Sequence, residues 1–248
     1  MSEHSRAFSL VAGVLLAGAT SVGGAETPAS LLAATDLFAR APAELRLELE
    51  VGAEGGKTRT PLELFRAGPE RALVRFLAPH ELGKFVLRIG RETWFLAPGA
   101  RAVRLGDALR LQGGAALDEL LGLSLARDYR IESYVEQNGI GTFELAALAP
   151  AAATPRVRWV VDLARRRPRR ADLLRRDGKA LRVVEFRGWL DAERLIPGEL
   201  AIADIARAAG KLVARFAAFD ARPLDPALFA LDDGGARARL PAPTGPSP

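Results

Sequence analysis

The stretch ALVRFLAPHELGKFVLRIGRETWFLAPGARAVRL, residues 72–105, decides how this chain folds. In it, large apolar side chains alternate with arginines and other polar residues through short runs, and each run closes at a proline or a glycine. Within residues 84–90, Phe85, Leu87 and Ile89 fall on one face and Val86 and Arg88 on the other. Successive side chains of a β-strand point to opposite faces, so a period of two predicts consecutive strands joined by tight turns.

The same period of two extends over most of the remaining chain and predicts a mainly β protein. The Asn138-Gly139 and Asp177-Gly178 pairs are typical of hairpin turns. Turn signals recur about every 8 to 12 residues, which is the spacing of a β-barrel or a β-sandwich. The further predicted strands are residues 45–51, 60–65, 71–79, 93–99, 102–105, 128–139, 141–150, 156–164, 171–176 and 179–190.

Helical periodicity is confined to short segments. Residues 30–41 carry leucines and Phe38 at helical spacing after Ser30, which can cap a helix. Residues 116–126 predict a second short helix. Residues 199–221 fit an amphipathic helix and a hairpin turning at Gly210 about equally, because their alanines favour a helix and the glycine inside the run favours two strands.

The N-terminus is typical of a secretory signal peptide. Its apolar run, residues 7–20, is long enough for the hydrophobic region of such a peptide and too short to span a bilayer as a helix. The small residues Gly23, Gly24 and Ala25 predict cleavage after Ala25. The alternative is a buried N-terminal helix, but the run has no polar face. We therefore expect an exported mature chain, residues 26–248, that forms a single domain with about ten disordered residues at its end.

The composition narrows the function further. The chain has no cysteine, which excludes thiolate catalysis, disulfides and a lipid anchor on cysteine. The formal net charge is +5, and residues 165–176, RRRPRRADLLRR, are the one dense basic block. A solvated hairpin end is the favoured interpretation of this block, and a docking patch for an anionic membrane or an acidic partner is the alternative. Few aromatic residues accompany it, which argues against the base stacking by which proteins bind single-stranded nucleic acid.

No enzymatic motif is complete. Residues 122–126, GLSLA, differ by one residue from the nucleophile motif G-x-S-x-G, with Ser124 in the nucleophile position. That motif needs a histidine later in the chain, yet His80 precedes Ser124 and is the one histidine after residue 25. A zinc site lacks ligands for the same reason. We expect a protein that is not an enzyme and has no cofactor and no metal.

Two segments resemble the LolA-like family of outer-membrane lipoprotein-sorting proteins. The first has a V-R-F strand followed by proline, a glycine-lysine turn, a W-x-x-x-P run and a basic strand, carried here by Val74, Arg75, Phe76, Pro79, Gly83, Lys84, Trp94, Pro98, Arg101 and Arg104. The second, residues 196–229, is similar to the closing hairpin of the family and its tail, here Leu224, Asp225, Pro226 and Phe229. Residues 120–129 depart from the family pattern.

The resemblance implies a strongly curved antiparallel sheet that forms an incomplete barrel, with short helices across its mouth and an apolar groove for acyl chains. It favours the hairpin for residues 199–221 and turns the face that carries Trp94 and Leu96 toward the groove. We expect inward faces without charged residues across several strands. The expected lipid-binding residues are Leu47, Leu49, Val74, Phe76, Phe85, Leu87, Trp94, Leu96 and Trp159. A packed core with no groove is the alternative for each of them.

A container of this kind has a plain physical purpose. Each acyl CH₂ exposed to water costs about 0.8 kcal/mol, so a chain of roughly sixteen carbons costs on the order of 12 kcal/mol. The expected function is a periplasmic carrier of acylated lipids or lipoproteins toward the outer membrane, with inner- and outer-membrane transport partners, peripheral membrane contact at most and no nucleic acid. The alternative is an envelope-sensing or protein-interaction module on the same scaffold.

Overall fold

The computed structural model describes residues 26–90, 92–105, 124–150, 152–206, 210–232 and 234–240. Within these ranges the chain is mainly β, with a few short helices. The strands are β1 (Glu44–Ala53), β2 (Arg59–Ala67), β3 (Arg71–Phe76), β4 (Phe85–Ile89), β5 (Glu92–Leu96), β6 (Val103–Leu105), β7 (Tyr129–Gln137), β8 (Ile140–Ala147), β9 (Arg156–Asp162), β10 (Arg167–Leu174), β11 (Ala180–Asp191), β12 (Ile196–Asp204) and β13 (Lys211–Asp220). The helices are α1 (Pro28–Thr35), α3 (Leu125–Asp128), α4 (Gly234–Ala238) and the 3₁₀ turns η1 (Pro79–Glu81) and η2 (Pro226–Phe229).

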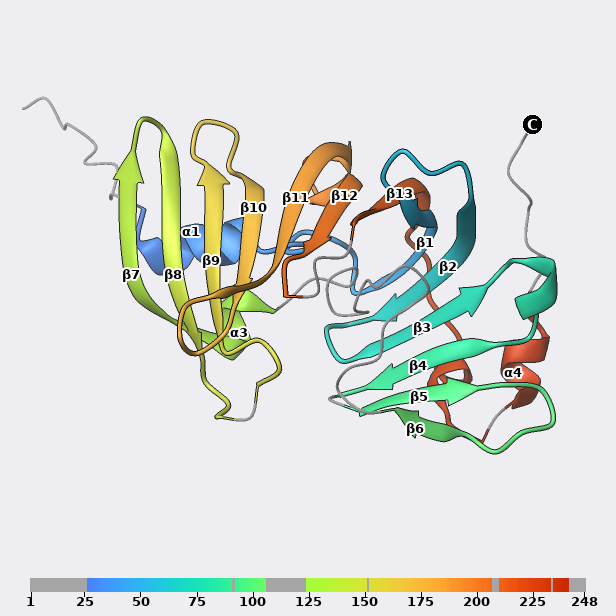
Figure 1. The fold of residues 1–248 in the computed structure, drawn as a ribbon. Helices are drawn as coiled ribbons and strands as arrows, with labels where there is room; N and C mark the ends of the chain where they lie inside the picture. The colour runs from blue at the N-terminus through green and yellow to red at the C-terminus, as the bar shows by residue number, and fades with distance from the viewer. Residues whose placement is uncertain are drawn as a thin grey trace, which may run out of the picture.

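All thirteen strands belong to one antiparallel sheet in the order β6-β5-β4-β3-β2-β1-β13-β12-β11-β10-β9-β8-β7. Neighbours in the sheet are neighbours in the chain, with one exception: β1 pairs with β13. Two meanders, β1–β6 and β7–β13, therefore meet at this single long-range ladder, and Figure 1 shows them as the two halves of a curved sheet. The sheet is not closed into a barrel, as the predicted incomplete barrel requires.

The alternation seen in the sequence accounts for the strands. In β1, Leu45, Leu47, Leu49 and Val51 are buried on one face, while the intervening residues are only partly buried. The outward side of β1 and its neighbours holds charge: Glu63 of β2 is almost fully buried and forms ion pairs with Arg46 and Arg75.

The predicted hairpins are confirmed. Asn138 and Gly139 both have positive φ, 52° and 74°, which is the backbone that joins β7 to β8 in a two-residue turn. Gly178 turns β10 into β11 with φ 80°. Residues 199–221 form the hairpin and not the helix, because β12 and β13 pair side by side and Gly210 lies immediately before β13.

The helices are shorter than predicted. Helix α1 begins earlier than residue 30, with Thr27 as its cap: the Ser30 backbone N–H donates to Thr27 Oγ1 at 3.2 Å. It ends at Thr35 and not at residue 41, because Asp36 has an extended backbone and Phe38 adopts a positive φ of 63°. Of the helix predicted at residues 116–126, most lies outside the described residues, as do the predicted signal peptide and the last eight residues. None of the helices described is long and apolar enough to cross a membrane.

Candidate functional site

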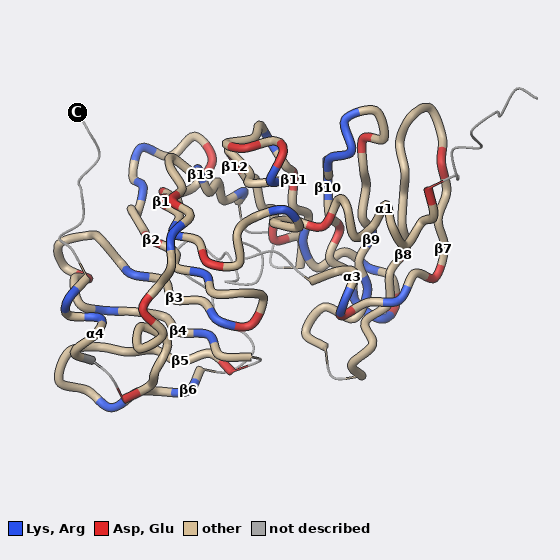
Figure 2. Tube along the Cα trace, turned by 180° about the vertical axis from the view of Figure 1, so that it is seen from behind, with Lys and Arg blue, Asp and Glu red and all other residues tan. Residues whose placement is uncertain are grey.

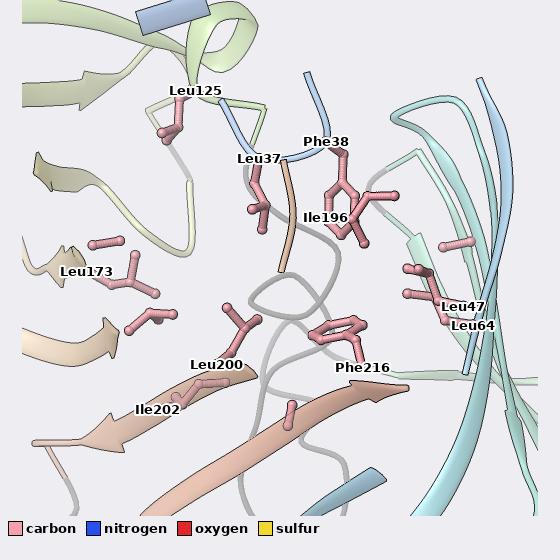
Figure 3. Packing of buried hydrophobic residues seen from close by; sticks show 14 of the residues in the cluster. Leu37, Phe38, Leu47, Leu64, Leu125, Leu173, Ile196, Leu200, Ile202 and Phe216 are labelled. Atoms are coloured by element: carbon pink, nitrogen blue, oxygen red, sulfur yellow. The ribbon is translucent and has the colours of Figure 1, made fainter. Parts of the chain in front are cut away.

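The sheet has an inner face on which both halves of the molecule share one apolar cluster. Strands β1–β4 contribute to this inner cluster from one half, β8–β11 from the other, and β12 and β13 between them. Figure 3 shows Leu47 and Leu64 pointing from one half toward Leu173 in the other, with Phe38 and Phe216 between them. A single cluster that joins strands so far apart in the sheet requires the sheet to curve around it, so this face is the concave one.

Helix α1 lies on this inner face. It buries Leu31 and Leu32 in the inner cluster. The indole Nε1 of Trp159 on β9 donates a hydrogen bond to Thr35 Oγ1 at 3.4 Å. Thr35 is itself fully buried. The helix is thereby held against the β9 part of the sheet, as Figure 1 shows.

Two aromatic side chains in the middle of the sheet are only half buried. Phe186 of β11 meets the Trp159 ring edge-on at 5.4 Å and stacks against Trp189 at 6.2 Å. Both Phe186 and Trp189 pack against the inner cluster. Residues three apart in a regular strand face opposite sides, but Gly188 between them has φ 73°, and the strand bends there so that both rings reach one face.

Sequence reasoning missed this aromatic pair. In a regular strand, residues 184, 186 and 188 share one face, so the pattern predicts an inward Phe186. The same pattern places Trp189 on the opposite, outward face. Gly188 was the available signal, because glycine inside a strand pattern marks a bulge or bend.

The structure divides the nine predicted lipid-binding residues between the two faces of the sheet. Leu47, Leu49, Val74, Phe76 and Trp159 lie in the inner cluster, where the prediction put them. The others do not join them.

The remaining four lie in a second cluster on the opposite, outer face. Phe85, Leu87 and Leu96 are buried there, and Trp94 packs against them half exposed. The expectation that Trp94 and Leu96 face the same groove as Val74 and Phe76 is therefore corrected. Lipid contact at any of the nine residues stays a prediction.

Strand register explains the division. Val74 pairs with Val86 and Leu73 with Leu87, so Leu87 shares a face with Leu73 and not with Val74. Trp94 pairs with Leu87 and follows it to the outer face. Each strand had an apolar face in the sequence, but which faces match across a turn depends on the pairing, and one residue of register exchanges them all.

The outer cluster is covered by the C-terminal segment. Leu224, Leu228, Phe229 and Ala236 pack on it, and the guanidinium of Arg71 lies 5.5 Å from the centre of the Phe229 ring. This segment includes the tail that resembles the family, and its residues 226–229 form η2. The tail thus closes the outer face of β2–β5.

The inner face also carries charge, which corrects the expectation of an uncharged inward surface. Arg66 follows Leu62 and Leu64 on the inward side of β2, and its guanidinium lies 5.2 Å from the centre of the Phe38 ring. Asp36 lies nearby, and its Oδ2 accepts a hydrogen bond from the backbone N–H of Ala126 at 3.3 Å. Burial raises the pKa of Asp36 to about 7, although Arg66 and backbone N–H groups act against the rise.

The described residues do not assemble a catalytic or metal centre. Ser124 caps α3 without a side-chain hydrogen bond, and His80 lies exposed in η1. Among the residues described, no three histidine, cysteine or carboxylate side chains come together as metal ligands.

The basic block of residues 165–176 occupies the tip of the β9–β10 hairpin and runs along β10 (Figure 2). Arg165, Arg166 and Arg170 are exposed and pair with carboxylates: Arg165 with Asp162 at 2.9 Å, Arg170 with Asp172 at 2.5 Å, and Arg166 with Glu26. These contacts fit the favoured interpretation of a solvated hairpin end.

The curved, open antiparallel sheet with an apolar inner face and a tail across its outer face is a LolA-like fold. A LolA superfamily protein from Nitrosomonas europaea superposes with a TM-score of 0.68 over 83% of this chain and 98% of that one, at 19% identity. A domain from Vibrio parahaemolyticus described as an outer membrane lipoprotein-sorting protein gives 0.63 over 80% and 92%, at 14% identity. A DUF1329 family protein from Desulfovibrio piger gives 0.59 over 77% and 90%, also at 14%. No protein-family model and no curated protein matches the sequence.

Proposed function

We propose that this protein is a periplasmic carrier that holds the acyl chain of a lipid or lipoprotein against its inner face and moves it toward the outer membrane. The observation that carries the proposal is the inner cluster itself, an apolar lining shared by both halves of an open, curved sheet. The LolA-like fold supports it, because one of the similar structures is described as a lipoprotein-sorting domain.

The half-buried aromatic pair indicates where a ligand enters. Phe186 and Trp189 lie on β11, in the half of the sheet opposite β1–β6, and water still reaches both rings. Covering apolar surface that water now touches stabilises a complex by about 25 cal/mol per Å². An acyl chain laid along Phe186 and Trp189 would gain this stabilisation without displacing the fully buried core of the protein.

Binding of a lipophilic fluorescent probe to the purified protein tests the proposal. We expect N-phenyl-1-naphthylamine to bind saturably and an acylated ligand to displace it. Trp189→Glu should weaken binding about tenfold or more, because its carboxylate would have to lose water against the acyl chain. The emission of Trp189 should shift to the blue on ligand binding in a variant that lacks the other two tryptophans.

Trp94→Glu is the matched control. Trp94 is half buried like Trp189, but it packs on the outer cluster. Its replacement should leave probe affinity unchanged, and its own emission should not respond to the ligand. Absence of saturable binding to the folded wild-type protein would exclude the carrier and leave the protein-interaction module. Equal losses in the two variants would remove the inner face as the site.

A further inference from the structure

Two arginines lie side by side on the inner face at one end of the apolar cluster. Arg66 of β2 pairs in register with Ala72 of β3, and Ala72 pairs with Arg88 of β4. Ala72 belongs to the inner cluster, and residues paired directly across antiparallel strands share a face. Both guanidinium groups therefore rise from the same face, on either side of a fully buried alanine.

Arg66 is poorly compensated for its burial. Its Nε is buried and has no hydrogen-bond partner, and among the described residues no carboxylate forms an ion pair with its guanidinium. Burial lowers the pKa of Arg66, and the neighbouring charge of Arg88 lowers it further. A buried donor without a partner costs free energy, and a ligand atom that accepts a hydrogen bond from this Nε–H would remove that cost.

The described residues compensate the charge of Arg66 only in part. Asp36 is the carboxylate that acts on Arg66, and its Oδ1 is buried without a hydrogen bond. Arg127 of α3 also acts on Asp36, but its guanidinium is paired with Asp128 at 2.9 Å and lies 3.6 Å from Glu70. The Nη2 of Arg88 donates to the Pro69 carbonyl at 2.8 Å.

We propose that Arg66, assisted by the charge of Arg88, binds the anionic headgroup, a carboxylate or a phosphate, of the amphiphile whose acyl chain lies on the inner face. The proposal rests on the proposed function and specifies its ligand class. The guanidinium is planar and presents several donors in a fixed fork, which matches the oxygens of carboxylate and phosphate. Phe38, stacked on Arg66, belongs to the inner cluster, so headgroup site and acyl surface are continuous.

Displacement of N-phenyl-1-naphthylamine by four amphiphiles with the same twelve-carbon chain tests this. They are dodecanoate, dodecyl phosphate, neutral dodecanol and cationic dodecyltrimethylammonium, each below its micelle concentration and at about pH 8, where both anionic headgroups are ionised. We expect at least one anion to displace the probe about tenfold or more better than dodecanol, and the cation to be the weakest. Preference for one anion over the other identifies the headgroup as carboxylate or phosphate.

Variants locate the headgroup site. Arg66→Gln should abolish the preference for the anion and leave dodecanol binding unchanged, and Arg88→Gln should reduce the preference several-fold. Arg215→Gln is the control, because Arg215 is a half-exposed arginine that is paired with Glu199 at 2.7 Å and does not belong to the inner cluster. Thermal melting of each variant shows that it is folded, and if Arg66→Gln does not fold, Arg88→Gln carries the test.

The outcomes separate this inference from the proposed function. Equal displacement by dodecanoate, dodecyl phosphate and dodecanol overturns the headgroup site while keeping the carrier. So does a preference for anions that persists in both Arg66→Gln and Arg88→Gln. If none of the four amphiphiles displaces the probe, the inner face does not bind acyl chains, and the proposed function itself is overturned.

Discussion

Asp36 is the C-cap residue of α1. Its carboxylate accepts from the backbone N–H of Ala126 and faces two guanidinium groups, those of Arg66 on β2 and Arg127 on α3. Desolvation outweighs all of these contacts, and the pKa of Asp36 rises to about 7. The native state therefore holds this proton over a range of pH in which the unfolded chain has released it.

The sign of the pH effect follows from that difference. Between about pH 4 and pH 7 the native state binds more protons at Asp36 than the unfolded state, so this residue makes the free energy of unfolding fall as pH rises. Asp36→Asn removes the dependence. We expect the variant to match the wild type near pH 4 and to exceed it above pH 7, by on the order of 4 kcal/mol. Urea denaturation at a series of pH values measures both curves.

Asp191 provides the control with the opposite sign. The backbone N–H of Arg194 donates to its carboxylate at 2.9 Å and holds its pKa below the ordinary value. Its contribution is present above the unfolded pKa and is lost as pH falls. Asp191→Asn should therefore destabilise the protein at neutral pH and not stabilise it.

A wild-type-like pH curve for Asp36→Asn would show that the Asp36 carboxyl is not desolvated.

At the scale of elements, the C-terminal segment is a cover for the outer face of β2–β5. Asp225 caps η2 by accepting from the Ala227 backbone N–H at 2.9 Å, and the Leu224 N–H donates to Glu44 at 2.7 Å. Phe229, 4% exposed, is the largest side chain that this segment buries in the outer cluster. The cover is thus attached to β1 by a hydrogen bond and to β2–β5 by apolar packing.

Removal of the Phe229 ring should lower the stability of the protein and leave ligand binding unchanged. Phe229→Ala should lower the free energy of unfolding by about 3 to 5 kcal/mol, the usual cost of truncating a buried phenylalanine. Probe affinity of the folded fraction should not change, because the ring lies on the face opposite the inner cluster. Urea denaturation and probe titration on the same sample check both. A parallel loss of affinity would mean that the two faces are coupled.

For Phe229→Ala, Phe216→Ala is the comparison. Phe216 is similarly buried but lies on β13 in the inner cluster. It should lose a similar amount of stability and also change probe affinity, which Phe229→Ala should not.

At the scale of the whole molecule, the sheet depends on one ladder between distant parts of the chain. Strand β1 pairs with β13 over eight residue pairs, with a register shift after Glu48, and every other ladder joins consecutive strands. The strands at the two ends of the order, β6 and β7, have a neighbour on one side only within the described residues. Strand β7 carries exposed charges and a register shift after Ile131, both of which discourage pairing with another chain.

Hydrogen exchange should reproduce this architecture. We expect the amides of β1, β12 and β13 to exchange slowest, because they are paired on both sides and lie under the inner cluster, and those of β6 and β7 to exchange fastest. Native-state exchange followed by mass spectrometry or NMR measures the order. Protection of β7 equal to that of β13 would contradict the open edge and would indicate a second chain paired there.

The sequence alone was sufficient for most of the strands, for the tight turns and for the mainly β class. Alternation and turn chemistry are local properties of the sequence. The pattern from Leu45 to Val51 predicts a strand, and Asn138-Gly139 predicts a turn, whatever the rest of the chain packs against them. The resemblance identified the tail at residues 224–229 but not the face of the sheet that it covers. The hairpin at residues 199–221 needed that resemblance, because its alanines and Gly210 favour opposite structures.

Only the tertiary structure decided which apolar face belongs to which side of the sheet. The sequence favours Phe76 and Trp94 equally as groove residues, yet they lie on opposite faces of the sheet. The reason is that the pairing register across two hairpins determines the face, which the pattern within a single strand does not. The approach of Asp36 to Arg66, thirty positions apart, came from the packing of α1 and α3 on the sheet. Hydrophobic patterning acts within a segment, whereas charge pairing and face assignment depend on distances that exist only after the segments have packed.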